Sequence, residues 1–459
     1  MKYMQGFVSG ALVLLLWLSA PFAGAQGLTE REERMMRLIE DLEKRVTELE
    51  KSLTEQDAPG AAPRPPASFE PTALPSGATP LTPYWKEGLH FDSADGDFKL
   101  QIGGRTQVDF AKFNQDGSLK TVVGDVENGV EFRRARLHVR GTIYKDYAFK
   151  AQYDFAGGKA GFRDVYLAMN HIPYVGQIKV GHFYEPMSLE QLTTDLYTTF
   201  MERSLMNDLF PERNTGIAIS NTALDQKLTW AVGAFRETDG FGNGANDSGG
   251  MAYTGRVTWL PWYEDDGEQL FHVGGSVSLR DIDGTIALRA RPEAHLSPLR
   301  FVDTQLFQAD DLQLFGGEMA LVYGPYSLQS EILQVRVKLQ NGGTEDLSGF
   351  YVFGSVFLTG EHRPYSKKNG AFGRVRPNTN FGFGEGGGWG AWELALRYST
   401  IDLDDSVLRG GEEKNFTLGV NWYLNPNMKT ALNYVHGEID HDLYKGDIDV
   451  VEARFQVDF

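Results

Sequence analysis

The stretch 130–155 carries a regular arrangement of charged side chains. From Arg134 onward, basic residues occupy every second position, and this set is Arg134, Arg136, His138 and Arg140. Successive side chains of a β-strand point to opposite faces, so this spacing places the basic residues together on one face of a strand. A guanidinium group presents a planar fork of donors that matches the oxygens of phosphate and carboxylate groups. The chemistry that this face could perform is therefore the binding of oxyanions.

The rest of this stretch completes a hairpin with one charged and one apolar face. The residues between the arginines are mostly apolar, and after a turn at 145–146 aromatic residues alternate with polar ones up to Phe155. In a soluble sandwich the apolar face would form the core and the charged face would meet water. In an outer-membrane barrel the apolar face would meet lipid and the charged face would line a lumen. The hairpin alone favours the soluble arrangement, and the rest of the chain reverses that preference.

Both ends of the chain indicate export and insertion into an outer membrane. Residues 1–25 combine a positive charge, a short apolar run and a small-residue cleavage site, which predicts a signal peptide removed before Gln26. The alternative, a membrane anchor, conflicts with a run too short to span a bilayer. The last segment, 449–459, alternates polar and apolar residues and ends on Phe459. Such an ending resembles the signal read by barrel-assembly machinery, although an ordinary edge strand could also end there.

The segment after the signal peptide, 26–56, is predicted to be a periplasmic coiled-coil helix. Apolar residues repeat at spacings of four and three, and they are Met35, Ile39, Leu42, Val46, Leu49 and Leu53. Their types favour a two-stranded over a three-stranded coiled coil, and a helix packed on its own barrel is the alternative. Residues 57–89 form a proline-rich linker, which is expected to be extended.

Residues 90–459 are predicted to form the barrel. The fold class is all-β, a transmembrane antiparallel β-barrel of about 16 strands preceded by the short coiled-coil helix, since an even number of alternating segments suits a single-chain bacterial barrel. One long segment, 185–213, separates the strands expected at 177–183 and 214–220. Long inserts of this kind are usually functional, so we expect it to fold inward and narrow the pore as the only suitable insert.

The cations and anions of the chain are expected to be segregated. The net charge is −18, which excludes nucleic acid as a partner of the whole chain. Strand positions on the lumen side nevertheless collect a cationic excess, which favours passage of anions. The candidate residues from this pattern are Arg105, Arg134, Arg136, Arg140, Lys179, Arg256 and Arg280. The alternative, that such residues only pair with lumen carboxylates, is strongest for Arg397 and Arg454.

The motifs of other function classes are incomplete. The glycines at 382–387 lack the strand and helix of a dinucleotide site, the run at 281–284 lacks the rest of a calcium loop, and the histidines lack metal-ligand spacing. No Ser-His-acid set is marked by the sequence. The chain contains no cysteine, so it forms no disulfides. We therefore expect a protein that is not an enzyme and uses no cofactor or metal.

Several runs resemble the phosphate-selective porin O and P family. They include FRRARLHVRGTIYKDYAFKAQYDF, GFRDVYLAMN, IKVGHFYEPMSLEQLTTDLYTTFMERSL, FLTGEHRPY, GAWELALRYS, FTLGVNWYLNPN and RFQVDF, in family order across most of 97–459. The resemblance implies a homotrimeric, sixteen-stranded barrel in the outer membrane of a Gram-negative bacterium, in contact with lipid and lipopolysaccharide, that passively admits small anions such as phosphate or polyphosphate.

By motif position, the resemblance assigns anion-binding roles to particular residues. Arg133 and Arg134 match the paired arginines of the family's early strand, and Arg203 matches the arginine of the inward loop. The family's neighbouring loop lysine has no counterpart, because the loop offers Gln191 and no lysine. A general porin, or a structural protein whose coiled coil spaces or tethers the outer membrane, is the alternative function.

Overall fold

The computed structural model describes residues 40–41, 44–45, 47–48, 77–244, 250–384 and 386–459. The chain divides into two compact units after Ala78. In the first unit, the described residues between 40 and 48 are helical and exposed. The predicted signal peptide, all six predicted heptad positions and most of the predicted linker lie outside the described residues.

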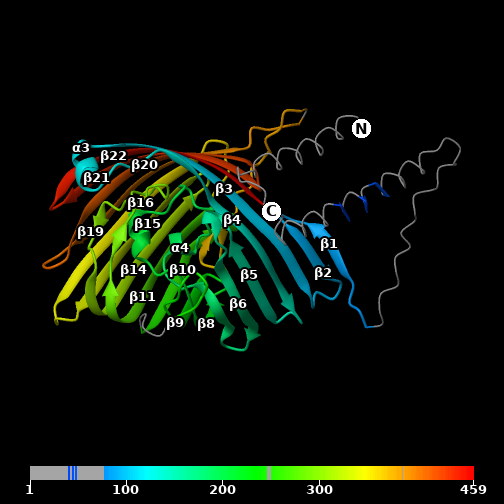
Figure 1. The fold of residues 1–459 in the computed structure, drawn as a ribbon. Coiled ribbons are helices and arrows are strands. Elements are labelled where there is room, and N and C mark those ends of the chain that lie inside the picture. Colours follow the sequence, from blue (N-terminus) through cyan, green and yellow to red (C-terminus); the bar gives the residue numbers. More distant parts are fainter. Residues whose placement is uncertain (1–39, 42–43, 46, 49–76, 245–249, 385) are drawn as a thin grey trace. The chain divides into compact units, whose positions relative to one another are not determined.

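The second unit is a closed antiparallel barrel (Figure 1). Each strand pairs with its neighbour in sequence, and β22 returns to pair with β3, so the sheet has no free edge among these strands. The sixteen barrel strands are β3 (Lys99–Gln115), β4 (Gly129–Ile143), β5 (Tyr147–Asp154), β6 (Gly161–Ile172), β7 (Gly176–Tyr184), β8 (Arg213–Ala223), β9 (Leu228–Arg236), β10 (Met251–Glu264), β11 (Gln269–Ile286), β14 (Phe307–Tyr323), β15 (Tyr326–Leu339), β16 (Thr344–Phe357), β19 (Ala391–Asp404), β20 (Arg409–Asn425), β21 (Met428–His441) and β22 (Tyr444–Asp458). The predicted fold class is confirmed.

A short hairpin precedes the barrel strands. Strands β1 (Leu81–Trp85) and β2 (Leu89–Ser93) pair with each other, and β2 pairs with the beginning of β3. Strand β1 lies at the end of the predicted linker, 57–89, and β2 begins at its last residue and continues into the predicted barrel segment. The residues of this hairpin alternate too briefly for the pattern to stand out beside the prolines.

The two faces of the barrel differ as the alternation predicts. On β22 the side chains of Val451, Phe455 and Val457 are exposed on the outside, whereas those of Glu452 and Arg454 are buried inside. Exposed large apolar residues recur on every barrel strand except β16, as a lipid-facing surface requires. No helix in the described part of the chain is long and apolar enough to cross a membrane.

Two β-bulges interrupt the alternation where charge is concentrated. The pairing of β3 with β4 shifts between Gln107 and Val108, so Arg133 and Arg134 both reach the lumen side. The pairing of β5 with β6 shifts after Ala151, and Arg163 and Asp164 both make contacts within the lumen. A bulge inserts one extra residue into a strand and re-aims its side chains. Counting alternate positions along a strand therefore cannot assign these arginines to the correct face.

Three long connections fill the lumen, and the sequence predicted only one of them. The first joins β7 to β8 and contains α4 (Leu189–Leu192) and the 3₁₀ turn η2 (Leu205–Leu209). The others carry the small hairpins β12 (Arg289–Ala290) with β13 (Val302–Asp303) and β17 (Tyr365–Ser366) with β18 (Ala371–Phe372). The expectation of a single suitable insert is wrong, because the glycine and proline content of the later segments hides their short elements.

An apolar wall inside the barrel holds these connections in place. On the lumen side of β14, β15, β16 and β19, buried aliphatic and aromatic residues replace the expected polar ones, and Leu205, Met206 and Phe210 of the first connection belong to the same cluster. This part of the lumen is a packed apolar cluster, and charged residues such as Glu331 and Arg397 lie on the same strands beside it. Burial of such side chains contributes about 1.5–3 kcal/mol each, which stabilises the inward position of the connection.

Closure of the barrel leads to a testable expectation about its stability. Because all strand edges between β3 and β22 are paired, the folded protein should resist detergent and unfold only on heating. Unboiled protein should run anomalously on a detergent gel and shift after boiling. A protein that shows the same mobility with and without boiling, and that stays soluble without detergent, would contradict the barrel.

Candidate functional site

The connection between β7 and β8, residues 185–212, crosses the lumen and is fastened mainly through its backbone. Its carbonyl oxygens accept hydrogen bonds from lumen side chains of distant strands: Gln456 donates to Leu196, Lys429 to Thr198, Asn421 to Thr199, Arg454 to Met201 and Arg397 to Glu202. The amides of Leu189 and Glu190 donate to Glu331 at 3.0 and 2.7 Å. We call this segment the inward loop. Its path is therefore fixed by both walls of the barrel.

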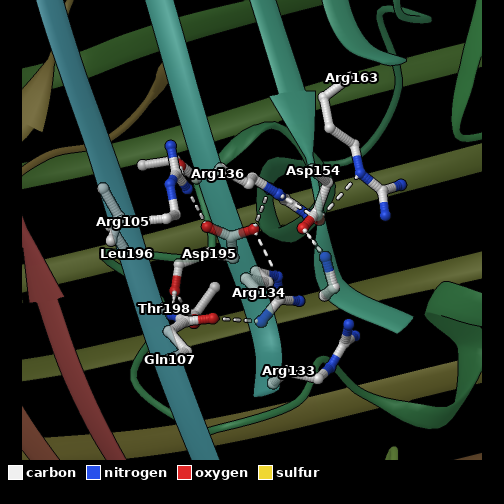
Figure 2. Close-up of polar contacts among 12 residues, drawn as sticks. Arg105, Gln107, Arg133, Arg134, Arg136, Asp154, Arg163, Asp195, Leu196 and Thr198 are labelled. Carbon is white, nitrogen blue, oxygen red and sulfur yellow. Dashed lines mark hydrogen bonds and ion pairs between the residues drawn. The ribbon is translucent and has the colours of Figure 1, made fainter. Parts of the chain in front are cut away.

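Arginines from β3 and β4 face the inward loop and converge on Asp195 (Figure 2). Arg134 Nε lies 2.7 Å from Asp195 Oδ2, Arg136 Nη1 donates to the same oxygen at 2.6 Å, and Arg105 Nη1 donates to Oδ1. Arg136 also binds Asp154 at 2.7 Å, as its cross-strand neighbour. One loop carboxylate thus serves three guanidinium groups.

A second loop carboxylate, Glu202, binds Arg133, the neighbour of Arg134 on β4. Arg133 donates to both oxygens of Glu202 at 2.8 and 2.9 Å, which is the bidentate geometry. Arg454 donates to Glu202 at 2.7 Å and to both oxygens of Asp109. The alternative given for Arg454, pairing with lumen carboxylates, is therefore present in the structure. Arg134 lies 3.9 Å from Glu202 and so stands between the two loop acids.

Both loop acids are held in the charged form. Burial disfavours ionisation of Asp195, but the guanidiniums of Arg105, Arg134 and Arg136 hold its pKa well below the ordinary range. Burial acts in the same way on Glu202, and Arg133, Arg134 and Arg454 hold the pKa of that carboxyl well below its ordinary range. Both side chains therefore carry a full negative charge at neutral pH.

A cavity of about 260 Å³, which we call the arginine chamber, lies between these residues and the inward loop. Seven arginines and five carboxylates of the described chain line it: Arg133, Arg134, Arg136, Arg163, Arg203, Arg213 and Arg291, with Asp195, Glu202, Asp208, Glu212 and Glu293. The lining therefore has a cationic excess, in contrast to the anionic chain as a whole. In a confined space of low dielectric such an excess attracts anions.

A larger cavity of about 500 Å³, the vestibule, adjoins the chamber and shares Arg163, Glu212 and Arg213 with it. One side of the vestibule is apolar, with Phe210 and Leu314 among its residues. The shared guanidinium of Arg163 donates to Asp154 at 3.2 Å and keeps about a third of its side chain exposed (33%). A solute that moves between the two cavities would therefore meet Arg163.

The other predicted cations lie elsewhere in the lumen. Arg140 donates to Gln101 at 2.6 Å, and Lys179 lies over the ring of Tyr166 at 4.7 Å. Two more have carboxylate partners outside the chamber, since Arg256 binds Glu318 at 2.6 Å and Arg280 binds Glu185 at 2.9 Å. Arg280 also lines the vestibule, whereas none of these four residues lines the chamber.

Arg203 is in the chamber, but its guanidinium is engaged by the inward loop itself. It donates to the carbonyl oxygens of Glu190, Gln191 and Thr193 at 2.9, 3.2 and 2.9 Å. This contact folds the loop back on itself. The sequence could not foresee it, because the partners are backbone atoms.

Sequence reasoning also missed the loop acids and several arginines of the chamber. Asp195 and Glu202 lie in the segment predicted to fold inward, and their charge was the available signal. Arg163 was hidden by the bulge in β6. Arg291 belongs to the second connection, which carried no periodic pattern.

A closed barrel with an apolar outside, a polar inside and a lumen narrowed by an inward loop defines an outer-membrane porin. The family model for phosphate-selective porins O and P matches residues 100–459, and the chain belongs to this family. The family prediction is confirmed, and with it the location in the outer membrane of a Gram-negative bacterium.

Known proteins similar to the chain agree with this assignment. Porin O of Pseudomonas aeruginosa is 27% identical over 395 residues, covering 77% of this chain and 86% of that protein. An uncharacterized protein of Caulobacter vibrioides is 28% identical over 439 residues, covering 89% and 85%. Among solved structures, the anion-selective porin from Comamonas acidovorans matches with a TM-score of 0.51 at 14% identity, covering 79% of this chain and 100% of that chain. At that identity the structural match shows the fold alone.

The contacts of Arg203 predict a role in holding the inward loop. Arg203→Ala removes three hydrogen bonds to loop carbonyls, so local opening of the loop should become easier by about 2 kcal/mol. Limited proteolysis of the folded barrel should then cut within 185–212 about thirty times faster than in the parent. Arg409→Ala, at the exposed beginning of β20, is the control. Equal cleavage rates for parent and Arg203→Ala would show that the loop does not depend on this residue.

Proposed function

We propose that this porin gives passive diffusion of small anions, of the phosphate and polyphosphate class, and that the arginine chamber selects them. The observation that carries the proposal is the chamber lining, where seven arginines face five carboxylates among the described residues while the whole chain has a net charge of −18. The concentration of positive charge at the narrowed part of the lumen supports selection by charge at that point.

The geometry of the chamber supports hand-over of an anion between several guanidiniums. Arg163 lines both cavities. Of the two arginines that bind Asp154, it is more exposed than Arg136. Deeper in, Arg134 and Arg136 are buried and shared between carboxylates. Selective conduction needs sites strong enough to admit an ion and weak enough to release it. Arginines already bound to carboxylates meet the second requirement.

The names of similar proteins agree with this proposal. One is called Porin O and another an anion-selective porin. We also propose that the chain assembles as a homotrimer, is exported by residues 1–25 and is recognised by barrel-assembly machinery at Phe459. The backbone of Phe459 exchanges hydrogen bonds with Gly104 of β3 at 3.0 and 2.7 Å, which places the chain end at the closing seam.

Ion selectivity is the direct test. In a planar bilayer under a KCl gradient, the reversal potential of the purified protein should show a preference for chloride over potassium, because the chamber has a cationic excess. A preference for potassium would contradict the proposal and favour a general porin. Deleting residues 26–83 should leave the selectivity unchanged, whereas a protein whose only role is spacing the membrane should show no selective pore at all.

The accessible arginine allows a sharper measurement. Arg163→Gln should raise the phosphate concentration that half-blocks the chloride current about two- to fivefold, as expected when one partly exposed ionic contact of roughly 0.5–1 kcal/mol is lost. Arg336→Gln, which makes the same change on an exposed side chain paired with Asp346, is the matched control. If both variants are blocked like the parent, anions do not pass by Arg163.

A further inference from the structure

The arginine cluster already holds an anion, and that anion is part of the chain. The Asp195 carboxylate lies within hydrogen-bonding distance of Arg105, Arg134 and Arg136 and is 8% exposed. Arg105 makes its other contact with the hydroxyl of Thr194 at 3.1 Å, and Arg134 makes its other close contact with the amide oxygen of Gln107 at 2.7 Å. Among the described residues, Asp195 is therefore the nearest carboxylate of all three guanidiniums, and Arg136 also binds Asp154 at 2.7 Å.

The inward loop does not need this carboxylate for its anchoring. On either side of Asp195, backbone carbonyls accept hydrogen bonds from strand side chains, as described for Leu196, Thr198 and Thr199. The carbonyl of Asp195 itself accepts from Gln107 at 3.4 Å. Apolar residues further along the loop pack on the lumen wall. The charge of Asp195 is thus separable from the position of the loop.

We propose that Asp195 is a specificity-determining residue: its carboxylate is a built-in counterion that competes with a passing oxyanion for Arg105, Arg134 and Arg136. The inference rests on the proposed anion pathway and adds how tightly that pathway holds its solute. With Asp195 present, phosphate is held weakly and passes on. With its charge removed, the same three guanidiniums form a site for a compact oxyanion such as inorganic phosphate.

The physical basis is the competition between two anions for the same donors. A phosphate group offers the oxygens that Asp195 now supplies, and contacts between guanidinium and oxyanion are among the stronger hydrogen bonds in proteins. While the carboxylate stays in place, an incoming anion must share donors with it and meets like-charge repulsion at short range. The low pKa of Asp195 means that protonation does not relieve this competition at neutral pH.

The test is the isosteric variant Asp195→Asn, which keeps the side-chain size and removes the charge. The concentration of inorganic phosphate that half-blocks the chloride current should fall about tenfold or more, because guanidiniums released from a carboxylate become available to phosphate. Single-channel records should show longer blocked intervals. The reversal potential under a KCl gradient should move further toward chloride.

A matched control makes the same substitution at an exposed position. Asp225 lies in the turn between β8 and β9 with φ 54°, a conformation that asparagine also adopts, so Asp225→Asn changes the net charge equally. Block of this control should equal that of the parent. If Asp195→Asn inserts as a heat-modifiable barrel and is blocked like Asp225→Asn, the proposal is overturned.

A second variant covers failure of the first to fold. Asp195→Asn combined with Arg105→Gln leaves the net charge of the parent unchanged and removes one of the released guanidiniums. Arg134 and Arg136 should still lower the half-blocking phosphate concentration below that of the parent, and an unchanged value would overturn the proposal. The reversal potential of the parent distinguishes failure of the proposed function from failure of this inference. A preference for potassium in the parent would refute the proposed function, and the phosphate block of the variants would still decide the role of Asp195.

Discussion

Charged groups lose their hydration when they are enclosed, and that cost governs the interior of this barrel. An isolated buried charge costs several kcal/mol, so guanidiniums that face a filled lumen need hydrogen-bonding partners, and most of those among the described residues have a carboxylate. The partners come mainly from the connections that enter the barrel. Asp195 and Glu202 meet the arginines of β3 and β4, and Glu293 from the second connection binds Arg397 at 2.6 Å. Ion pairing thereby makes the carboxylates of the connections part of the electrostatics of the lumen.

The apolar wall inside the barrel complements these ion pairs because it holds the inward loop in place. Ion pairs between a loop and a strand are individually replaceable by water or by a solute, whereas the packed cluster that includes Leu205 and Phe210 is not. Apolar packing on one wall and backbone hydrogen bonds on the other fix the loop. Its carboxylates are left to set the electrostatics of the chamber. In this porin, one part of the lumen is therefore a packed apolar core, and another part is a charged cavity.

The sequence predicted the closed sixteen-stranded barrel, the inward loop and the basic face of β4, because a two-residue period repeated over many strands is a local signal. It could not predict which charges are free. The partners of Arg105 and Arg133 are Asp195 and Glu202, far away in sequence, and no local pattern links them. Assigning faces by simple alternation also failed for Arg163, because the bulge in β6 changes which face each later side chain of the strand points to. The anion-binding roles of these residues remain predictions.

The bulges at the arginine pair of β4 and in β6 have a consequence for how this barrel can change over generations. Each is a one-residue fault in register that brings two consecutive polar side chains into water. Without the fault, one guanidinium of the pair would point into hydrocarbon, at a cost of about 2–4 kcal/mol near the membrane midplane. Substitutions around Arg133 and Arg134 alter the charge of the pore by single steps. Deletion of one residue of the pair would remove the bulge and restore regular alternation with both faces in place, so the composition and the length of this stretch can each change by one residue without turning the strand over.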